Sequence, residues 1–450
     1  MPTKLRIAFL THEPFYPPSG GGSAEAVYLV QEMARRGHAV HVFGPKIPDA
    51  DAVAKKFGVT LHPFEKWEMG RYAKLRNFKY VAYPFFLERM VMAAVKSGLP
   101  VASDPLSPRG TSGERAGERG DSKNQKPPLP GPLLPPASGR EGDKSSGLKF
   151  DLLFSQHAIS AVAAGKLKKK LGVPVVMNFP DLLTGFMETW PSYIAPKPLV
   201  HALMRYEISL PVRYGVDGVC AISDEFTARL AARGYPREKI CPIYYGYDAQ
   251  AFPLRQQLPP AGSPPVVVMH GSFDAHHLGQ IAFDAVKTVV AKRPDVVFRF
   301  VGRRTAGLEK FLQRAQAIPG FKSDVPGFTP YAEVSAKLAS ATVGIVPYEE
   351  SAGTHCAFVA KIVEYVATGL PTVCTPLKSV QGYFKNDPLV KFAGFDGVSF
   401  GEKILEWLAA PVSAWQPHAE KSSARVRAEL DWQPLCRKAV DFAEQIQQGV

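Results

Sequence analysis

The stretch CAFVAKIVEYVATGLPTVCTP, from Cys356 to Pro376, joins a helix to a strand and places two charges on the helix. Apolar side chains recur at helical spacing, Gly369 ends the helix, and Pro371 prevents it from continuing. The run TVCT then predicts a short buried strand. Lys361 and Glu364 are three residues apart and share one helix face. The stretch predicts an α/β unit, and it raises the question of why a buried helix carries a charged pair.

The alternation of strand and helix continues on both sides of this stretch. Buried strands are predicted in two series, at residues 5–11, 39–45, 151–156, 173–179 and 216–223, and then at residues 265–271, 296–302, 342–348 and 372–375. The series indicate two Rossmann-like, doubly wound parallel sheets in two domains, residues 1–252 and 253–429. A final helix is predicted within 430–450, with packing back on the N-terminal domain as one option. Ligands are expected between the domains, beyond the carboxyl ends of the strands.

The composition restricts the class of protein. The 450 residues are 46% apolar and 21% charged, which is typical of globular chains, and no apolar run is long enough for a membrane span. No secretory signal is recognised, and five scattered cysteines without a CxxC pair indicate reduced thiols in a cytoplasm. The net charge of +13 is compatible with an anionic membrane surface or an anionic substrate. Nucleic acid is not expected as a partner, because no basic run interleaved with aromatics occurs.

Residues 101–147 differ from the rest of the chain. They contain 8 Pro and 8 Gly but no aromatic residue, which predicts a disordered, solvated insertion in the N-terminal domain. A proline-rich docking site is the alternative interpretation. With 7 basic and 6 acidic residues, the segment carries only +1 of the net charge, so the basic surplus belongs to the folded part.

Two candidate ligand-binding features lie in the N-terminal half. Gly21 and Gly22 belong to a long glycine-rich loop that leads into a helix, where free backbone amides favour anions or sugar hydroxyls; a flexible surface loop is the alternative. His157 directly follows a predicted strand, at the edge where ligands bind, although a lone histidine is more often structural.

The C-terminal half offers candidates for binding a diphosphate. Arg303 and Arg304 end a predicted strand and suit a diphosphate, with a solvated surface pair as the alternative. Thr354 lies in the loop ESAGTHCAF ahead of the helix amides. Lys361 follows within two turns, and Glu364 could accept hydrogen bonds from a ribose. An intrahelical Lys–Glu pair is the alternative for these two residues.

No metal site is predicted. His276 and His277 are adjacent, so their side chains are expected to diverge, and no Cys, His or Asp spacing typical of a metal site surrounds them.

Several of these motifs together resemble the GT-B glycosyltransferases of the group-1, glycosyltransferase family 4-like type. The resemblance rests on SGGGSAEAVYLVQEMARRGHAVHVFG, on CAISDEFTARLAARGYPREKICPIYYGYDAQAF, and on YAEVSAKLASATVGIVPY with AKIVEYVATGLPTVCT. It covers nearly the whole chain except the insertion. The family implies a GT-B fold and transfer of a sugar from a nucleotide-diphosphate sugar, as a co-substrate, to an acceptor hydroxyl.

The resemblance also implies roles for individual residues. Glu364 matches the second glutamate of the family's paired-glutamate motif, which holds the nucleotide ribose. Gly21 and Gly22 match the loop beside the donor diphosphate, and His157 matches a histidine near the reacting sugar, the predicted catalytic residue.

The chain departs from the family in two places. Cys356 stands where the first glutamate of the motif is expected. The loop from His270 to Gly279, which includes the predicted donor-binding residue Gly271, lacks the family's arginine and lysine. Arg303, Arg304 and Lys361 are therefore predicted to bind the diphosphate in their place.

The resemblance thus implies a retaining hexosyltransferase that makes cell-surface polysaccharide or glycolipid, and no metal is expected to be required. A glycan or lipid-linked acceptor is expected, at the cytoplasmic face of the plasma membrane, and residues 77–98 could form an interfacial helix or a helix packed on the core. Two alternatives stay open: a non-catalytic GT-B protein that binds a nucleotide or glycan and acts as a scaffold, and a nucleotide-sugar epimerase.

Overall fold

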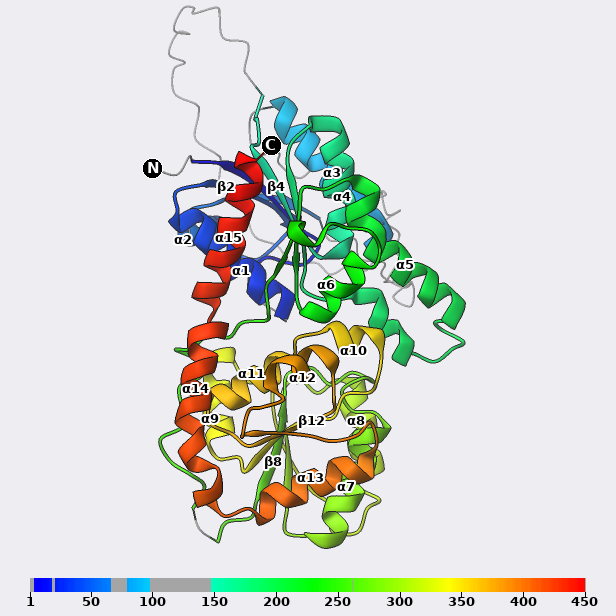
Figure 1. Cartoon of the computed structure of the whole chain (residues 1–450), viewed down its shortest axis with the longest axis vertical. Helices are drawn as coiled ribbons and strands as arrows, with labels where there is room; N and C mark the ends of the chain where they lie inside the picture. The colour runs from blue at the N-terminus through cyan, green and yellow to red at the C-terminus, as the bar shows by residue number, and fades with distance from the viewer. Residues whose placement is uncertain (1–3, 18–20, 66–78, 98–146, 261, 450) are drawn as a thin grey trace, which may run out of the picture.

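All strand pairings in the computed structural model are parallel, and they form two separate sheets (Figure 1). The structure describes residues 4–17, 21–65, 79–97, 147–260 and 262–449, so the predicted insertion lies outside it apart from Gly147. The fold class is the predicted one, with two doubly wound α/β domains.

The first sheet has the strand order β3-β2-β1-β4-β5-β6-β7. Its strands are β1 (Arg6–Thr11), β2 (Ala39–Pro45), β3 (Thr60–Phe64), β4 (Leu152–Gln156), β5 (Val175–Phe179), β6 (Gly218–Ala221) and β7 (Ile240–Pro242). The helices of this domain are α1 (Gly21–Arg35), α2 (Ala50–Phe57), α3 (Lys79–Ser97), α4 (His157–Leu171), α5 (Lys197–Tyr214) and α6 (Asp224–Ala231), with the short 3₁₀ turns η2 (Leu183–Thr189) and η3 (Arg237–Lys239). The central strands are fully buried apolar runs because helices cover both faces of the sheet.

The second sheet has the order β10-β9-β8-β11-β12-β13. Its strands are β8 (Val266–His270), β9 (Val297–Val301), β10 (Lys322–Gly327), β11 (Val343–Val346), β12 (Thr372–Cys374) and β13 (Val390–Phe392). The helices that follow β8 along the chain are α7 (Gln280–Lys292), α8 (Ala306–Ala315), α9 (Tyr331–Ala339), α10 (Ala352–Cys356), α11 (Ala360–Ala367), α12 (Lys378–Phe384), α13 (Gly397–Ala409), α14 (Gln416–Leu430) and α15 (Trp432–Gln448), with the 3₁₀ turn η4 (Val412–Ala414). In both sheets the strand order reverses at the centre, between β1 and β4 and between β8 and β11.

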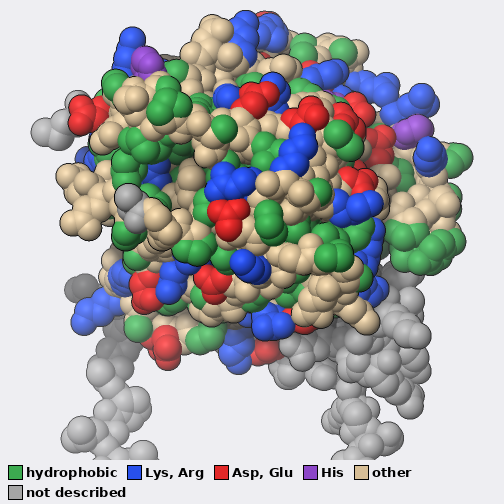
Figure 2. Space-filling model, turned by 90° about the horizontal axis from the view of Figure 1, so that it is seen from below, with side chains coloured by type: hydrophobic (Ala, Val, Ile, Leu, Met, Phe, Trp, Pro, Cys, Tyr) green, Lys and Arg blue, Asp and Glu red, His purple; other side chains and the backbone are tan. Residues whose placement is uncertain are grey.

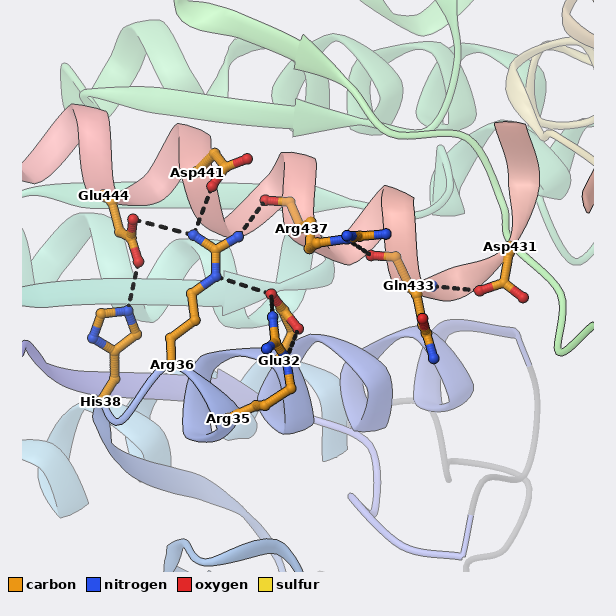
Figure 3. Close-up of polar contacts among 9 residues, drawn as sticks. All are labelled: Glu32, Arg35, Arg36, His38, Asp431, Gln433, Arg437, Asp441 and Glu444. Atoms are coloured by element: carbon orange, nitrogen blue, oxygen red, sulfur yellow. Dashed lines mark hydrogen bonds and ion pairs between the residues drawn. The ribbon is translucent and has the colours of Figure 1, made fainter. Parts of the chain in front are cut away.

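The chain passes between the domains twice, at neighbouring points. Tyr247 and Asp431 form a parallel bridge, and the Tyr247 amide donates to the Leu430 carbonyl at 3.0 Å. After this second crossing, α15 packs along α1 in the N-terminal domain (Figures 1 and 3). The two crossings lie side by side, so the domains share one narrow connection.

Ion pairs fix α15 on α1. Arg36 lies 2.6 Å from Asp441 and 3.1 Å from Glu444, while His38 lies 2.8 Å from the other oxygen of Glu444 (Figure 3). Glu32 accepts a bond from Arg36 within α1. These contacts tie the last helix of the chain to the first one.

The structure corrects one local expectation. Residues 350–358 were expected to be a loop, but Ser351 and Thr354 form a capping box that starts the short helix α10. The chain is then extended at Ala357 and Val359 before α11 begins. Gly369, at a φ of 73°, ends α11 as the sequence predicts.

Helix α3 covers the core on one side and is exposed on the other. Leu87, Val91 and Ala94 are completely buried, whereas 77% of Val81 and 56% of Phe85 are exposed. The packed interpretation of residues 77–98 therefore holds for most of the helix, and its outer face still carries apolar side chains. No helix within the described ranges is sufficiently long and apolar to span a membrane.

Candidate active site

The ends of β1 and β4 bring two histidines together at the first switch point, the place where the strand order of the first sheet reverses. The register pairs Thr11 with Gln156, so the next residues, His12 and His157, are neighbours, with ring centroids 5.0 Å apart. His157 is buried and has a φ of 67°, a left-handed conformation that is costly for a residue with a Cβ. Neither ring nitrogen has a hydrogen-bond partner in the described chain. Strain and unpaired polar atoms at a strand end are typical of a functional residue.

Carboxyl groups surround His157. Nε2 of His157 lies 3.6 Å from Oε2 of Glu13. Burial alone would lower the pKa of His157, but Glu13, followed by Asp181 and Glu25, raises it above the usual value. Burial would raise the pKa of Glu13, and the histidine charge outweighs this and lowers it to about 2. The two pKa shifts have one physical cause, the attraction between the His157 ring when it is protonated and the ionised Glu13.

Three further carboxyl groups are desolvated around this pair. Burial raises the pKa of Asp181 to about 7, and it also raises the pKa of Glu25 and Glu207. Glu25 accepts a bond from Gln156 at 3.0 Å, and its other oxygen has no partner among the described residues. Glu207 accepts from the amides of residues 183 and 184. The pKa of Asp181 thus lies in the range useful for proton transfer.

The second switch point carries the charged pair of α11. Glu364 is almost completely buried; one oxygen accepts a bond from the Tyr331 hydroxyl at 3.0 Å, and the other is bonded to Nε2 of His270. Lys361 is also buried and donates to the Tyr348 hydroxyl at 2.9 Å. Lys361 and Glu364 are not hydrogen-bonded to each other. Lys361 bonds instead to Tyr348, just after β11, and Glu364 bonds to His270 at the end of β8 and to Tyr331 at the start of α9.

Lys361 and Gly271 are in close contact. A Cβ atom built on Gly271 would lie 3.2 Å from Nζ of Lys361, and the φ of this glycine is 95°. Burial lowers the pKa of Lys361 to about 8, although Glu364 and then Asp274 raise it. The ammonium group is therefore still protonated at neutral pH, desolvated, and directed at the end of β8. Gly271, Lys361 and Glu364 were predicted as donor-binding residues, and the structure brings these three together.

The other predicted donor-binding residues lie elsewhere. The exposed Arg304 pairs with Glu309 at 2.6 Å, and the Arg303 guanidinium lies over the Phe328 ring at 4.8 Å. The Thr354 hydroxyl is buried and used in the capping box of α10. In addition, Gly21 and Gly22 form the first residues of α1, after residues that are outside the described ranges. Their predicted contacts with a donor stay predictions.

Cys356 occupies a structural position. It is completely buried, burial raises its pKa to about 12, and its carbonyl accepts a bond from the Ser223 hydroxyl at 2.6 Å. The thiol is therefore neither a nucleophile nor a substitute for a carboxylate. All five cysteines are buried and free, as expected for reduced thiols.

The loop after β8 contradicts the expected geometry of its histidines. The rings of His276 and His277 do not diverge: their centroids are 3.8 Å apart. The reason is a turn in which the Asp274 carbonyl accepts the amides of His277 and Leu278, so strand or helix geometry does not apply. Burial, together with the charge of Lys361, lowers the pKa of His276 to about 4 and that of His277 well below its usual value.

The two switch points face each other across direct domain contacts. The Phe186 ring, from η2, packs 4.9 Å from that of His276, and the Ala352 amide donates to Glu188 at 2.6 Å. Tyr245 lies between both sets of carboxylates. Burial raises its pKa well above the usual value, and residues of both domains raise it further, namely Glu364, Glu25 and Asp181.

Comparison with known families agrees with this geometry. The sequence model of the glycosyl transferase 4-like domain matches residues 20–246, and that of glycosyl transferases group 1 matches residues 264–409. The chain belongs to the group-1 glycosyltransferase family. The first match covers β2 to β7 and the second covers β8 to β13, whereas β1, α14 and α15 lie outside both. No curated protein matches the chain in sequence.

Solved structures share the fold at low sequence identity. Sucrose-phosphate synthase from Thermosynechococcus elongatus is 13% identical, with a TM-score of 0.70 over 99% of this chain and 100% of that one. HepE from Anabaena, in complex with UDP and glucose, is 12% identical, with a TM-score of 0.60 over 97% and 98%. WaaG, a glycosyltransferase involved in lipopolysaccharide biosynthesis, is 14% identical, with a TM-score of 0.59 over 97% and 99%. The likeness to these structures establishes the GT-B fold.

Sequence reasoning missed several residues of this group-1 site. His270, Tyr331 and Tyr348 complete the surroundings of Lys361 and Glu364, but nothing in their local sequence distinguishes them from core residues. Asp181 could have been found, since it follows the strand VPVVMNF closely, as His157 follows the strand before it.

Proposed function

We propose that the chain transfers a sugar from a nucleotide-diphosphate sugar to an acceptor hydroxyl, between the ends of its two sheets. The observation that carries this proposal is the pairing of two unlike groups at facing switch points. On one side lie the buried Lys361 and Glu364, and on the other lie the strained His157 and its carboxyl groups. The first group suits a nucleotide, and the second suits a reacting sugar and a hydroxyl.

The donor half follows from charge and hydrogen bonding. Each oxygen of Glu364 accepts one bond within the protein, which leaves a further lone pair on each for ribose hydroxyls. Lys361, desolvated beneath Gly271, would contact the diphosphate and stabilise the charge that develops on the leaving group. The HepE complexes with UDP and UDP-glucose make UDP-sugars the first donors to test.

In the transfer, the bond from the anomeric carbon to the diphosphate oxygen breaks and a bond to the acceptor oxygen forms. The acceptor proton must leave, and Asp181, with a pKa of about 7, is the best placed group to receive it. The family resemblance leads us to expect retention of the anomeric configuration.

We further propose a glycan or lipid-linked acceptor and a peripheral contact with an anionic membrane at its cytoplasmic face. The segment before and along α5 exposes apolar side chains, with exposed fractions of 84% for Tyr193, 57% for Ile194 and 51% for Leu199. Arg205 and Arg213 line a groove of about 520 Å³ on the same helix. Apolar and basic side chains side by side suit an anionic interface. Substitution of these three apolar residues by serine should reduce sedimentation with phosphatidylglycerol vesicles, whereas phosphatidylcholine vesicles should bind neither form.

The donor site is tested by thermal-shift and calorimetric titration of the full chain with UDP, GDP, ADP and their sugars. One nucleotide should stabilise the protein, and Glu364→Gln should weaken its binding by about 10- to 100-fold, as expected for hydrogen bonds to a charged group. Glu402→Gln, at an exposed position of α13, is the matched control and should bind normally. Equal affinity in the Glu364 and Glu402 variants would overturn the assignment of the donor site.

Turnover separates transfer from its alternatives. Consumption of donor only when an acceptor is added supports a transferase, whereas a new sugar nucleotide formed without acceptor would indicate an epimerase, which the carboxyl groups around His157 would also suit. Binding without turnover would indicate a scaffold protein, consistent with Cys356 in place of a glutamate. Following the reaction over time by NMR spectroscopy distinguishes transfer, epimerisation and binding without turnover.

A further inference from the structure

The turn after β8 brings together three side chains that commonly bind metals. One ligand atom from each of Asp274, His276 and His277 lies within 4.8 Å of the other two, and this is the only such group of three found in the described parts of the chain. The Asp274 side chain is 62% exposed, whereas that of His277 is 9% exposed. The group is therefore open to solvent on one side and enclosed on the other, as an open coordination site requires.

Contacts outside the group hold its backbone in place. The His276 carbonyl accepts the amide of Glu349 at 2.9 Å, and the Phe273 carbonyl accepts the Thr305 hydroxyl at 2.8 Å. The ring of His277 also packs edge-on against Tyr348, with centroids 4.7 Å apart. These contacts fix the backbone that carries the three ligands and the ring of one of them. The Asp274 amide donates to Nδ1 of His277 at 3.0 Å, so an ion bound at that nitrogen would replace this bond.

The neighbourhood has a shortage of cations for a diphosphate. Lys361 is buried beside the same loop, whereas Arg304 is paired with Glu309 and Arg303 is stacked on Phe328. A nucleoside diphosphate carries two or three negative charges, and one ammonium group neutralises only part of that charge. An ion held by the three ligands would supply the rest.

We propose, in place of the metal-independent donor binding expected from the sequence, that Asp274, His276 and His277 bind a divalent transition-metal ion whose coordination is completed by diphosphate oxygens of the donor. Two imidazoles and a carboxylate suit Mn²⁺, Co²⁺, Ni²⁺ or Zn²⁺ better than Mg²⁺ or Ca²⁺. The participation of the diphosphate rests on the proposed function, but the binding of the metal does not. Because Lys361 repels a nearby cation, a bridging anion should make metal and nucleotide bind cooperatively, each raising the affinity for the other.

Metal binding is tested on the full chain, after treatment with EDTA and desalting, by titration with Co²⁺ and Mn²⁺. Wild type should bind one ion, with visible Co²⁺ absorption, and the His276→Gln/His277→Gln double variant should bind ~10-fold more weakly or worse. His418→Gln, at an exposed histidine on α14, is the matched control and should bind like wild type. Should the double variant fail to fold, Asp274→Asn provides the same comparison at an exposed side chain. Unchanged affinity in these ligand variants would overturn the metal site.

Titration with UDP, with and without Mn²⁺, tests the role of the diphosphate. Tighter UDP binding with Mn²⁺, lost in the double variant, supports the full proposal. Metal binding without any effect on UDP would overturn the diphosphate role and leave the site itself. UDP binding that depends on Glu364 without any metal binding would overturn this proposal and leave the proposed function intact.

Discussion

Lys361 shows how a residue can serve a ligand at the expense of stability. Burial lowers its pKa from 10.5 to about 8, so below pH 8 the folded protein keeps a charged group that the unfolded chain would solvate better. The buried charge therefore lowers the free energy of unfolding, whereas a stabilising ion pair raises it. Stability is reduced most at neutral pH, and the loss disappears as the pH rises through 8 towards 10.5.

Lys361→Met should accordingly raise the free energy of unfolding by up to about 3 kcal/mol at pH 7 and by about half of that at pH 9.5. The lost bond to the Tyr348 hydroxyl reduces the gain somewhat. Urea denaturation at both pH values measures the difference, with the exposed Lys287→Met as control. The same variant should lose nucleotide binding. A destabilised Lys361→Met protein at both pH values would instead indicate a purely structural lysine.

Asp181 is expected to govern the pH dependence of transfer. Its pKa is raised to about 7 by burial, so the fraction that can accept a proton rises with pH through this value. We expect kcat/KM to increase between pH 6 and pH 8 in wild type. In Asp181→Asn, transfer should fall by about 10²- to 10⁴-fold and this limb of the profile should vanish. Glu188→Gln, at an interdomain position, is the control, and an unchanged profile in Asp181→Asn would exclude Asp181 as the base.

At the scale of elements, Arg36 is the central cation of the ion pairs between the N-terminal domain and α15 (Figure 3). Arg36 is only 15% exposed and pairs with Asp441 and Glu444, so its removal leaves two carboxylates of α15 without their cation. Arg36→Met should destabilise the protein by about 1–3 kcal/mol and speed hydrogen exchange in α15. Arg35→Met is the matched control, because Arg35 is 66% exposed and pairs only with Glu32. Equal exchange in the two variants would contradict this role of Arg36.

Elements whose limits depend on local signals could be predicted from the sequence. Gly369 ends α11 because only a left-handed residue fits there, and that requirement is visible in the chain itself. The break between α10 and α11 could not be predicted, because hydroxyls from distant segments bond the carbonyls at this point. Ser223 donates to the Cys356 carbonyl, and Ser379 donates to that of Ala357. Pairing between distant residues cannot be seen in a local pattern.

The candidate site was predictable to a similar degree. Lys361 and Glu364 could be proposed because charges on a buried helix are costly unless they are used. The neighbours that define their function, His270 and Tyr331, come from β8 and α9 and meet only once the sheet is formed. His276 and His277 were misjudged because regular spacing was assumed where a turn directs both rings the same way.

At the scale of the whole molecule, the surplus of basic side chains does not form a basic patch on every face of the protein. Figure 2 views the chain from the end of the C-terminal domain, where Lys and Arg are interspersed with Asp and Glu. Exposed apolar side chains accompany basic ones on α3 and along α5 of the N-terminal domain, and Phe328 and Val398 are exposed on the C-terminal domain. The cluster along α5 is the surface that we propose for the membrane contact. The C-terminal domain is joined to this domain by the two connecting segments and by direct contacts such as the bond from the Ala352 amide to Glu188.

The predicted insertion offers a test of how much of the chain the fold requires. The described residues on either side of 98–146 lie close together: a Cβ on Gly147 would be 1.9 Å from the Val95 carbonyl oxygen, in the last turns of α3. A short Gly-Ser linker could therefore replace residues 98–146 without moving α3 or β4. If the segment is a solvated insertion, closing a shorter loop costs less entropy, and stability should rise by up to about 2 kcal/mol. Urea denaturation and nucleotide titration of the shortened protein measure this, with donor affinity expected to be unchanged. A loss of stability would show that the segment packs on the domain, and a loss of vesicle or acceptor binding alone would assign it a docking role.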